Sequence, residues 1–166
     1  LASMGNYKFE SDGDGGILTN GVGCYTPDYK VSDTVVSRIS NVVNNTLSSL
    51  ERKGAPYVGI LGVDCTITGE DKFFVNEFKP FLQDFDAHAV LNTIDDDLLK
   101  IFHACVDGLF SDEYEQINQN DTASVSAVVR AGNIAQKILG LDMVEDINNI
   151  DFQNVKQTND GNYVTQ

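Results

Sequence analysis

The chain has 166 residues, 42% hydrophobic and 22% charged, which is enough to bury a core in one domain or in one domain and part of another. Its formal net charge of −14 opposes binding to nucleic acid and to anionic membrane, so neither is expected as a direct partner. Three separated cysteines, Cys24, Cys65 and Cys105, contain no C-x-x-C pair and favour a reduced, cytoplasmic protein. No apolar run approaches the roughly 18 residues that a membrane span needs.

A glycine-rich, acidic loop at residues 11–27 is the first feature that we expect along the chain. The small residues at positions 1–5 are typical of filler and are not expected to belong to the fold. Glycine at this density usually marks backbone that other residues cannot adopt. Successive backbone N–H groups in such a loop can hold an anion, but a tight solvent-exposed turn explains the composition equally well.

An amphipathic helix and a hairpin follow the glycine-rich loop. Ser32 or Asp33 can cap a helix whose apolar residues recur at three- and four-residue steps, with Gly54 at its expected end. Two runs rich in β-branched and aromatic residues, within positions 57–78, then flank a short turn at positions 69–71. This pattern predicts an antiparallel hairpin.

The hairpin carries a candidate metal site. Asp64 lies on its first strand and Glu77 near the end of its second, so both side chains fall on one face if the register allows. Two carboxylates in this arrangement suit Mg²⁺, which prefers oxygen ligands. Lys79 lies two residues beyond Glu77 and points to the same side, where an ion pair with Glu77 competes with a metal. A backbone-capped Asp64 and a solvated Glu77 are the alternative.

The rest of the chain predicts a second helix and a second unit. Acidic residues from Asp84 to Asp86 are expected in a loop after the strand, where functional groups often lie. Three aspartates, 95–97, precede a helix whose apolar residues form a buried stripe: Leu98, Leu99, Ile101, Phe102, Cys105 and Leu109. A polar stretch at 111–122 marks a boundary, and residues 123–132 predict a buried strand, with further strands near Val155 and Tyr163.

Four segments of the chain carry a family resemblance: DGDGGILTNGVGCYTP at residues 12–27, PYVGIL at 56–61, EFKPFLQDFD at 77–86 and ASVSAVVRAGN at 123–133. In this order they resemble phosphoribosylamine–glycine ligase (glycinamide ribonucleotide synthetase), a family of the ATP-grasp superfamily. The first resembles its D-G-D-x-G-P-N-T-G-G-M-G-A-Y-[SA]-P loop and the second its P-F-x-G-V-L strand. The third resembles its E-[FY]-N-V-R-F-G-D-P-E segment, and the fourth the strand that opens its C-terminal domain.

The resemblance implies a ligase that joins glycine to 5-phosphoribosylamine in de novo purine biosynthesis, with ATP and Mg²⁺. It implies Glu77 as a Mg²⁺ ligand, while Asp64 resembles a metal ligand of other ATP-grasp ligases. It also implies a set of residues on the glycine and phosphoribosylamine side: Asp12, Asp14, Thr19, Gly21, Gly23, Tyr25 and Asp84. No catalytic side chain is assigned to this chain.

Departures from the family pattern leave an alternative function open. Lys79 stands where the family has an Asn metal ligand, Phe81 stands where it has Arg, and Leu18 and Asn20 differ within the loop. The family's N-terminal domain and ATP-clamping half have no counterpart in the sequence, so weak or no Mg·ATP binding is expected of this chain alone. The alternative to a ligase completed by an N-terminal half, in the same or a separate chain, is a non-catalytic ATP-grasp relative that acts as a binding or interaction module.

The predicted fold class is α+β. Residues 1–112 are expected to form the C-terminal half of an ATP-grasp domain, an antiparallel sheet with packed helices. Residues 113–166 are expected to begin a small β-rich domain.

Overall fold

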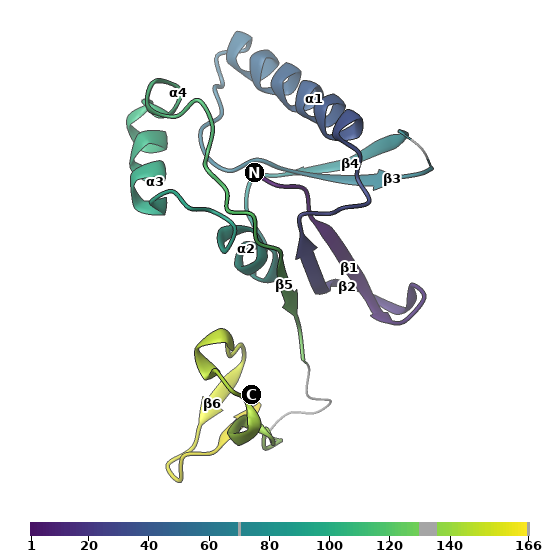
Figure 1. The fold of residues 1–166 in the computed structure, drawn as a ribbon, viewed down its shortest axis with the longest axis vertical. Helices are drawn as coiled ribbons and strands as arrows, with labels where there is room; N and C mark the ends of the chain where they lie inside the picture. Colours follow the sequence, from purple (N-terminus) through teal and green to yellow (C-terminus); the bar gives the residue numbers. More distant parts are fainter. Residues whose placement is uncertain (70, 130–135, 166) are drawn as a thin grey trace. The chain divides into compact units, whose positions relative to one another are not determined.

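The computed structural model describes residues 1–69, 71–129 and 136–165, and it has a mixed α+β fold with small antiparallel sheets (Figure 1). The chain divides into two compact units, Leu1–Val128 and Val129–Gln166. The helices and strands of the first unit are β1 (Gly5–Ser11), β2 (Gly15–Thr26), α1 (Asp33–Arg52), β3 (Gly62–Ile67), β4 (Phe73–Lys79), α2 (Asp84–Leu91), α3 (Leu98–Asp107), α4 (Phe110–Glu113) and β5 (Ser124–Ala127).

The glycine-rich segment is a β-hairpin, which corrects the predicted loop. It forms the end of β1, a turn at residues 12–14 and the whole of β2. The three-stranded sheet has the order β1-β2-β5, and all its pairs are antiparallel. The opening residues also belong to the fold, because Thr26 Oγ1 donates a hydrogen bond to the Ser3 carbonyl at 2.9 Å.

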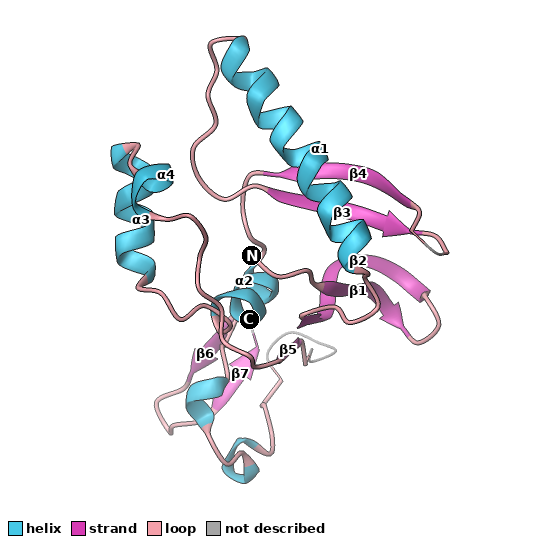
Figure 2. Ribbon diagram, turned by 45° about the horizontal axis from the view of Figure 1, so that its top comes forward, coloured by secondary structure: helices cyan, strands magenta, loops and turns pink. Residues whose placement is uncertain are grey.

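The second hairpin pairs β3 with β4, as the sequence predicts, and Glu70 of its turn lies outside the described residues. Its first strand begins only at Gly62, so residues 56–61, which were expected as a strand, form a loop before it. Helix α1 meets this hairpin at its N-terminal end (Figures 1 and 2), where Ser32 Oγ donates a hydrogen bond to Asp71 Oδ1 at 2.8 Å. Ser32 caps α1 by accepting a hydrogen bond from the Val35 amide at 3.3 Å, and the helix ends at Arg52 before Gly54, close to both predicted limits. Arg38 of α1 lies over the Phe73 ring at 5.4 Å from its centroid, which joins helix to hairpin.

The acidic segment that begins at Asp84 is a helix, α2, and not the predicted loop. Helix α2 packs against β2 and β5. The three aspartates do precede a helix, α3, and Asp97 caps it by accepting hydrogen bonds from the amides of Leu99 and Lys100.

The predicted buried stripe of α3 is only partly buried. Ile101 is 4% exposed, but Leu99 and Phe102 are 67% and 43% exposed. Leu99, Phe102 and Val106 recur at steps of three and four residues, so they share an exposed apolar face of this helix. We call these three residues the α3 stripe.

The core of the chain is small. Its buried apolar side chains among the described residues are Cys24, Val35, Ala89, Val90, Ile101 and Ala104. The chain exposes 11999 Å². Two separate compact bodies of the sizes of the two units would expose only about 9,400 Å² in total. The chain therefore carries much more uncovered surface than compact units of these sizes.

The second unit contains two short 3₁₀ turns, Leu141–Met143 and Ile147–Asn149, and a hairpin of β6 (Val155–Gln157) and β7 (Tyr163–Thr165), as predicted near Val155 and Tyr163. Phe152 stacks on Tyr163 with ring centroids 4.6 Å apart.

The strand predicted at 123–132 is β5, which pairs with β2 in the first unit. It was expected to be buried, but Val125 is exposed, and residues 130–132 lie outside the described part. Across residues 1–69, 71–129 and 136–165, the longest helices lack the apolar length that a membrane crossing requires.

Candidate functional site

A wide bulge interrupts the β1–β2 hairpin at Thr19. Tyr7 pairs with Gly23 and Phe9 pairs with Leu18, so the four residues 19–22 of β2 face Lys8 alone. Thr19 organises this bulge: its Oγ1 donates to the Lys8 carbonyl at 2.8 Å and accepts from the Gly21 amide at 3.0 Å. The threonine hydroxyl thus replaces part of the backbone pairing that the bulge interrupts.

Gly21 lets helix α2 approach the bulge closely. Its φ of +140° is a conformation that favours glycine. A Cβ atom at this position would lie 1.9 Å from Cζ of Phe85, which comes from α2. The aromatic ring of Phe85 therefore packs directly on the Gly21 backbone, and no larger residue fits.

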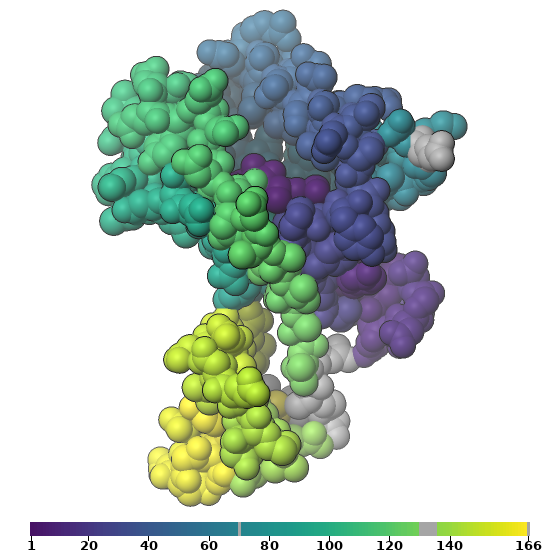
Figure 3. Space-filling model, in the orientation of Figure 1, coloured from purple at the N-terminus to yellow at the C-terminus, as the bar shows by residue number. Residues whose placement is uncertain are grey.

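The residues predicted to bind substrate are spread along this hairpin. Asp12 and Asp14 are exposed in the turn, which projects from the rest of the first unit (Figures 1 and 3). Thr19 and Gly21 lie in the bulge, whereas Gly23 and Tyr25 lie at the far end of β2. At about 3.3 Å per strand residue, the turn and Tyr25 are on the order of 25 Å apart. Asp84 is exposed in the first turn of α2, next in sequence to Phe85.

Tyr25 is held in place by Asp28. Its hydroxyl donates a hydrogen bond to Asp28 Oδ1 at 2.8 Å. Burial, this hydrogen bond and the Asp28 charge together raise the pKa of Tyr25 to about 12, so the phenol is neutral at physiological pH. The side chain can therefore act as a hydrogen-bonding group but not as a base.

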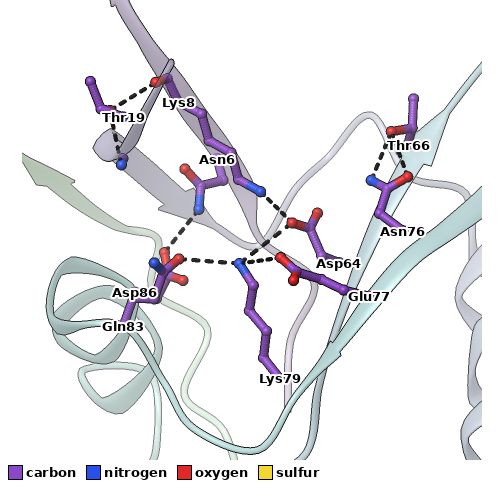
Figure 4. Close-up of polar contacts among 11 residues, drawn as sticks. Asn6, Lys8, Thr19, Asp64, Thr66, Asn76, Glu77, Lys79, Gln83 and Asp86 are labelled. Carbon is purple, nitrogen blue, oxygen red and sulfur yellow. Dashed lines mark hydrogen bonds and ion pairs between the residues drawn. The ribbon is translucent and has the colours of Figure 1, made fainter. Parts of the chain in front are cut away.

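Asp64 and Glu77 lie directly opposite each other on β3 and β4, so the predicted shared position of these carboxylates is confirmed. The ammonium group of Lys79 contacts both of them from the side that faces Gln83 (Figure 4). Its Nζ is 3.2 Å from Glu77 Oε1 and 3.5 Å from Asp64 Oδ2, which confirms the predicted ion pair with Glu77. The same Nζ is 3.3 Å from Oε1 of Gln83, the N-cap residue of α2.

Two residues of β1 complete this arrangement. Lys8 donates to the same Asp64 Oδ2, and Asn6 Nδ2 donates to Asp86 Oδ1 at 3.1 Å (Figure 4). Asn6 and Lys8 are two positions apart on the strand, so their side chains share a face. We call the whole group the lysine–carboxylate cluster: Asn6, Lys8, Asp64, Glu77, Lys79, Gln83 and Asp86. It joins β1, β3, β4 and α2.

The two lysines set the protonation of the cluster. Burial opposes ionisation of Asp64, but the hydrogen bond and charge of Lys8, followed by the charge of Lys79, lower its pKa below 3.8. Burial likewise opposes the charge of Lys79, but Glu77 and Asp64 outweigh it and raise the pKa of the ammonium group. Both groups are therefore fully charged at neutral pH.

Asp86 differs from the other carboxylates of the cluster. It is only 5% exposed, and burial raises its pKa although the charges of Lys79 and Lys8 offset part of this effect. Its described hydrogen-bond donor, Asn6, has an amide oxygen that is itself buried and without a partner among the described residues. The Asn6–Asp86 contact is the least well satisfied part of the cluster.

The cluster does not fit a divalent cation. In the described ranges, no group of three or more His, Cys, Asp and Glu side chains is arranged to hold a metal ion. The two predicted ligands, Asp64 and Glu77, are together, but ammonium groups already contact an oxygen of each. A metal between these carboxylates would have to displace Lys79.

Sequence reasoning missed Asn6, Lys8 and Gln83. The alternation of polar and apolar residues in residues 6–9 was the available signal for β1, and it places Asn6 and Lys8 on one face. Nothing in the sequence near Lys8 points to Asp64, because the pair is separated by 56 positions.

Comparisons with known proteins agree with this arrangement of motifs. Residues 1–87 match the model of the family described as phosphoribosylglycinamide synthetase, ATP-grasp (A) domain. The human trifunctional purine biosynthetic protein adenosine-3 is 30% identical over 130 residues, which cover 76% of this chain and 13% of that protein.

Bacterial relatives are similar to the same degree. Phosphoribosylamine–glycine ligase of Allochromatium vinosum is 33% identical over 109 residues, covering 65% of this chain and 26% of the ligase. The Streptomyces coelicolor protein of the same name is 30% identical over 149 residues, covering 84% of this chain and 35% of the relative. The chain thus spans about a third or less of the length of these relatives.

Proposed function

The chain belongs to the phosphoribosylglycinamide synthetase ATP-grasp family, and we propose that it forms part of an ATP-dependent ligase that joins glycine to 5-phosphoribosylamine in purine biosynthesis. The observation that carries this proposal is the structure of the β1–β2 hairpin, which contains the segment that resembles the family's loop. Thr19 organises a bulge in this hairpin, and the close approach of the Phe85 ring leaves room only for glycine at position 21. A hairpin held this closely against α2 is suited to positioning a small substrate.

In this proposal the residues along the hairpin contact glycine and phosphoribosylamine. Thr19 and Gly21 shape the bulge, and Asp84 is close in sequence to the ring that supports it. Asp12 and Asp14 at the turn, and Gly23 and Tyr25 toward the other end of β2, contact the remainder of the substrates or the parts of the enzyme that close over them. Tyr25 contributes as a neutral hydrogen-bonding group.

We also propose the domain assignment that the family suggests. Residues 1–112 correspond to part of an ATP-grasp domain, with its antiparallel sheet and packed helices, and residues 113–166 correspond to the start of a C-terminal β-rich domain. In this assignment β5 is the first strand of the C-terminal domain in sequence, although it pairs with β2 of the ATP-grasp part.

The complete enzyme is proposed to need an ATP-clamping N-terminal half, in the same or a separate chain. The large exposed surface and the α3 stripe support this part of the proposal, because they leave apolar side chains for another part of the enzyme to cover. ATP and Mg²⁺ are assigned to the complete enzyme, in the cytoplasm, and this chain by itself is proposed to be inactive.

The lysine–carboxylate cluster favours a second candidate, a non-catalytic ATP-grasp relative that acts as a binding or interaction module. Phosphoryl transfer from ATP depends on metal ions that neutralise the developing charge. Here the oxygens of Asp64 and Glu77 form ion pairs with lysine ammonium groups. A chain that does not catalyse phosphoryl transfer could still use its hairpin to bind a partner or a small molecule.

The test is incorporation of labelled glycine by the complete protein that contains this chain, with ATP and phosphoribosylamine. The ligase proposal expects a glycine-containing phosphorylated product that depends on both. Thr19→Val removes the hydroxyl that organises the bulge and should lower kcat/KM about tenfold or more. Thr34→Val, the same change on the exposed side of α1, is the matched control and should have no effect.

The two candidates separate on the outcome of this assay. Product formation contradicts the non-catalytic candidate. A folded complete protein that forms no product contradicts the ligase. Equal activities for Thr19→Val and wild type would contradict the role given to the bulge.

A further inference from the structure

We propose that the ammonium group of Lys79 is a built-in cation that takes the place of a divalent metal between Asp64 and Glu77, and that Lys79 is the residue that keeps such a metal out. The proposal concerns only the lysine–carboxylate cluster; in the ligase, other residues of the complete enzyme would then have to hold the Mg²⁺.

Lys79 makes one hydrogen bond and two ion pairs. Its Nζ faces three oxygens, Asp64 Oδ2 at 3.5 Å, Glu77 Oε1 at 3.2 Å and Gln83 Oε1 at 3.3 Å (Figure 4). These oxygens come from β3, from β4 and from the residue that begins α2, so one cation joins three elements.

The distances suit an ammonium group and not a metal. Mg²⁺ requires oxygens at about 2.0–2.1 Å in an octahedral arrangement. A metal at the position of Nζ would need each of the three side chains to move inward by more than about 1 Å. The side chain of Lys79 is 17% exposed, so it cannot simply swing away into solvent while its partners stay in place.

The charge balance also opposes a metal. Lys8 places a second ammonium group on Asp64 Oδ2, so two lysines match the charges of Asp64 and Glu77, while Asp86 adds a third, buried carboxylate to the cluster. A divalent cation would bring two further positive charges close to both ammonium groups. Removal of the Lys79 charge would leave one excess negative charge beside Glu77, together with the space that its ammonium group had filled.

A surface salt bridge of no consequence is the competing explanation for Lys79. Such pairs join two exposed side chains and contribute little. Lys79 instead contacts two carboxylates and an amide oxygen on three elements, and it is mostly shielded from solvent. The geometry therefore matches a structural cation better than an isolated surface pair.

The experiment measures Mn²⁺ binding, as a spectroscopic substitute for Mg²⁺, by electron paramagnetic resonance of the complete protein that contains this chain. The quantity of interest is the binding that Glu77→Gln abolishes, since this isolates the cluster from any other metal site. Wild type should show none of this Glu77-dependent binding. Lys79→Asn, which offers an amide oxygen in place of the ammonium group, should create it, with an affinity about tenfold or more above that of the same variant carrying Glu77→Gln.

Lys72→Asn is the matched control, because it removes the same charge from the exposed turn of the same hairpin and should create no site. Glu77-dependent Mn²⁺ binding by wild type would overturn the proposal, whatever the variants do. A folded Lys79→Asn protein without such binding would overturn it as well. If Lys79→Asn does not fold, Lys79→Gln takes its place, and the wild-type measurement still decides. None of these results depends on glycine incorporation, so they are distinct from the test of the ligase.

Discussion

Lys8 of β1 forms an ion pair with Asp64 of β3, 56 positions further along the chain, and this contact ties the two hairpins of the first unit together. The pair is half-buried, with 29% and 21% of the two side chains exposed. Because Lys79 contacts the same Asp64 oxygen, loss of Lys8 leaves the carboxylate with a single cation.

Lys8→Met should therefore lower the free energy of unfolding by about 1–2 kcal/mol, since it removes the charge and keeps most of the apolar stem. Urea denaturation at neutral pH measures the change. Lys72→Met, at an exposed lysine of the β3–β4 turn, should alter stability by less than about 0.5 kcal/mol. A double-mutant cycle with Asp64→Asn should show coupling between the two sites, and strictly additive effects would contradict the importance of the ion pair.

The pH dependence of stability should differ in sign between Asp64 and Asp86. Burial opposes ionisation of Asp64, but Lys8 and Lys79 outweigh it and place its folded-state pKa below 3.8, so it stabilises the fold above that pH and loses this effect as pH falls through the folded-state pKa. Burial raises the pKa of Asp86 above 3.8, so its contribution to stability declines as pH rises through its folded-state value.

Denaturation of Asp64→Asn and Asp86→Asn at several pH values between acid and neutral tests this contrast. The destabilisation caused by Asp64→Asn should shrink toward acid. Asp86→Asn keeps an oxygen for Asn6 and should become more favourable, relative to wild type, as pH rises. Parallel pH profiles for the two variants would contradict the electrostatic description of the cluster.

Gly21 should be the most sensitive glycine of the β1–β2 hairpin. Gly21→Ala places a Cβ atom 1.9 Å from Cζ of Phe85 and forces alanine to a φ of +140°, so a loss of about 3 kcal/mol or more is expected. Gly54→Ala is the control, because Gly54 has a φ of +75° but nothing within 4 Å of the added atom, and it should cost about 1 kcal/mol.

The Phe85 ring, and not the backbone angle alone, should account for most of the Gly21→Ala effect. The cost of Gly21→Ala in a Phe85→Ala background should therefore fall well below its cost in wild type, as measured by urea denaturation. An undiminished cost in that background would assign the effect to the backbone conformation.

The parts of the structure that the sequence predicted are those with local causes. The Ser32 and Asp97 caps, and the alternation within the β3–β4 hairpin, depend on residues a few positions apart, so α1, α3 and the opposition of Asp64 and Glu77 followed from pattern alone. The sequence predicts a loop at Asp84–Asp86 because Pro80 ends the preceding strand, and Gln83 provides no side-chain cap that would have marked the start of α2. The Lys8–Asp64 pair depends on a distant register that no local pattern encodes.

Helix α3 shows why burial was harder to predict than helicity. Apolar residues occupy more than one side of this helix, so periodicity identified a helix but could not show which side finds a partner. Contacts within the chain bury Ile101 and Ala104 and leave the α3 stripe exposed. Which side of α3 is buried depends on tertiary contacts and not on the local sequence.

Substitutions on the two sides of α3 should therefore have very different effects in the isolated chain. Ile101→Ser and Val106→Ser are the same kind of change, from a β-branched apolar residue to serine with a similar helix propensity. Ile101 is 4% exposed and Val106 is 83% exposed. Ile101→Ser should cost about 3 kcal/mol or more, whereas Val106→Ser should stay within about 0.5 kcal/mol, both by urea denaturation.

Dye binding provides a second measurement of the α3 stripe. A fluorescent hydrophobic probe should bind the isolated chain, and the double variant Phe102→Ser, Val106→Ser should bind less of it because the exposed apolar area is smaller. In a complete protein whose other parts cover this surface, Val106→Ser should become as costly as Ile101→Ser. Equal costs already in the isolated chain would show that the stripe is covered from within, contrary to the structure.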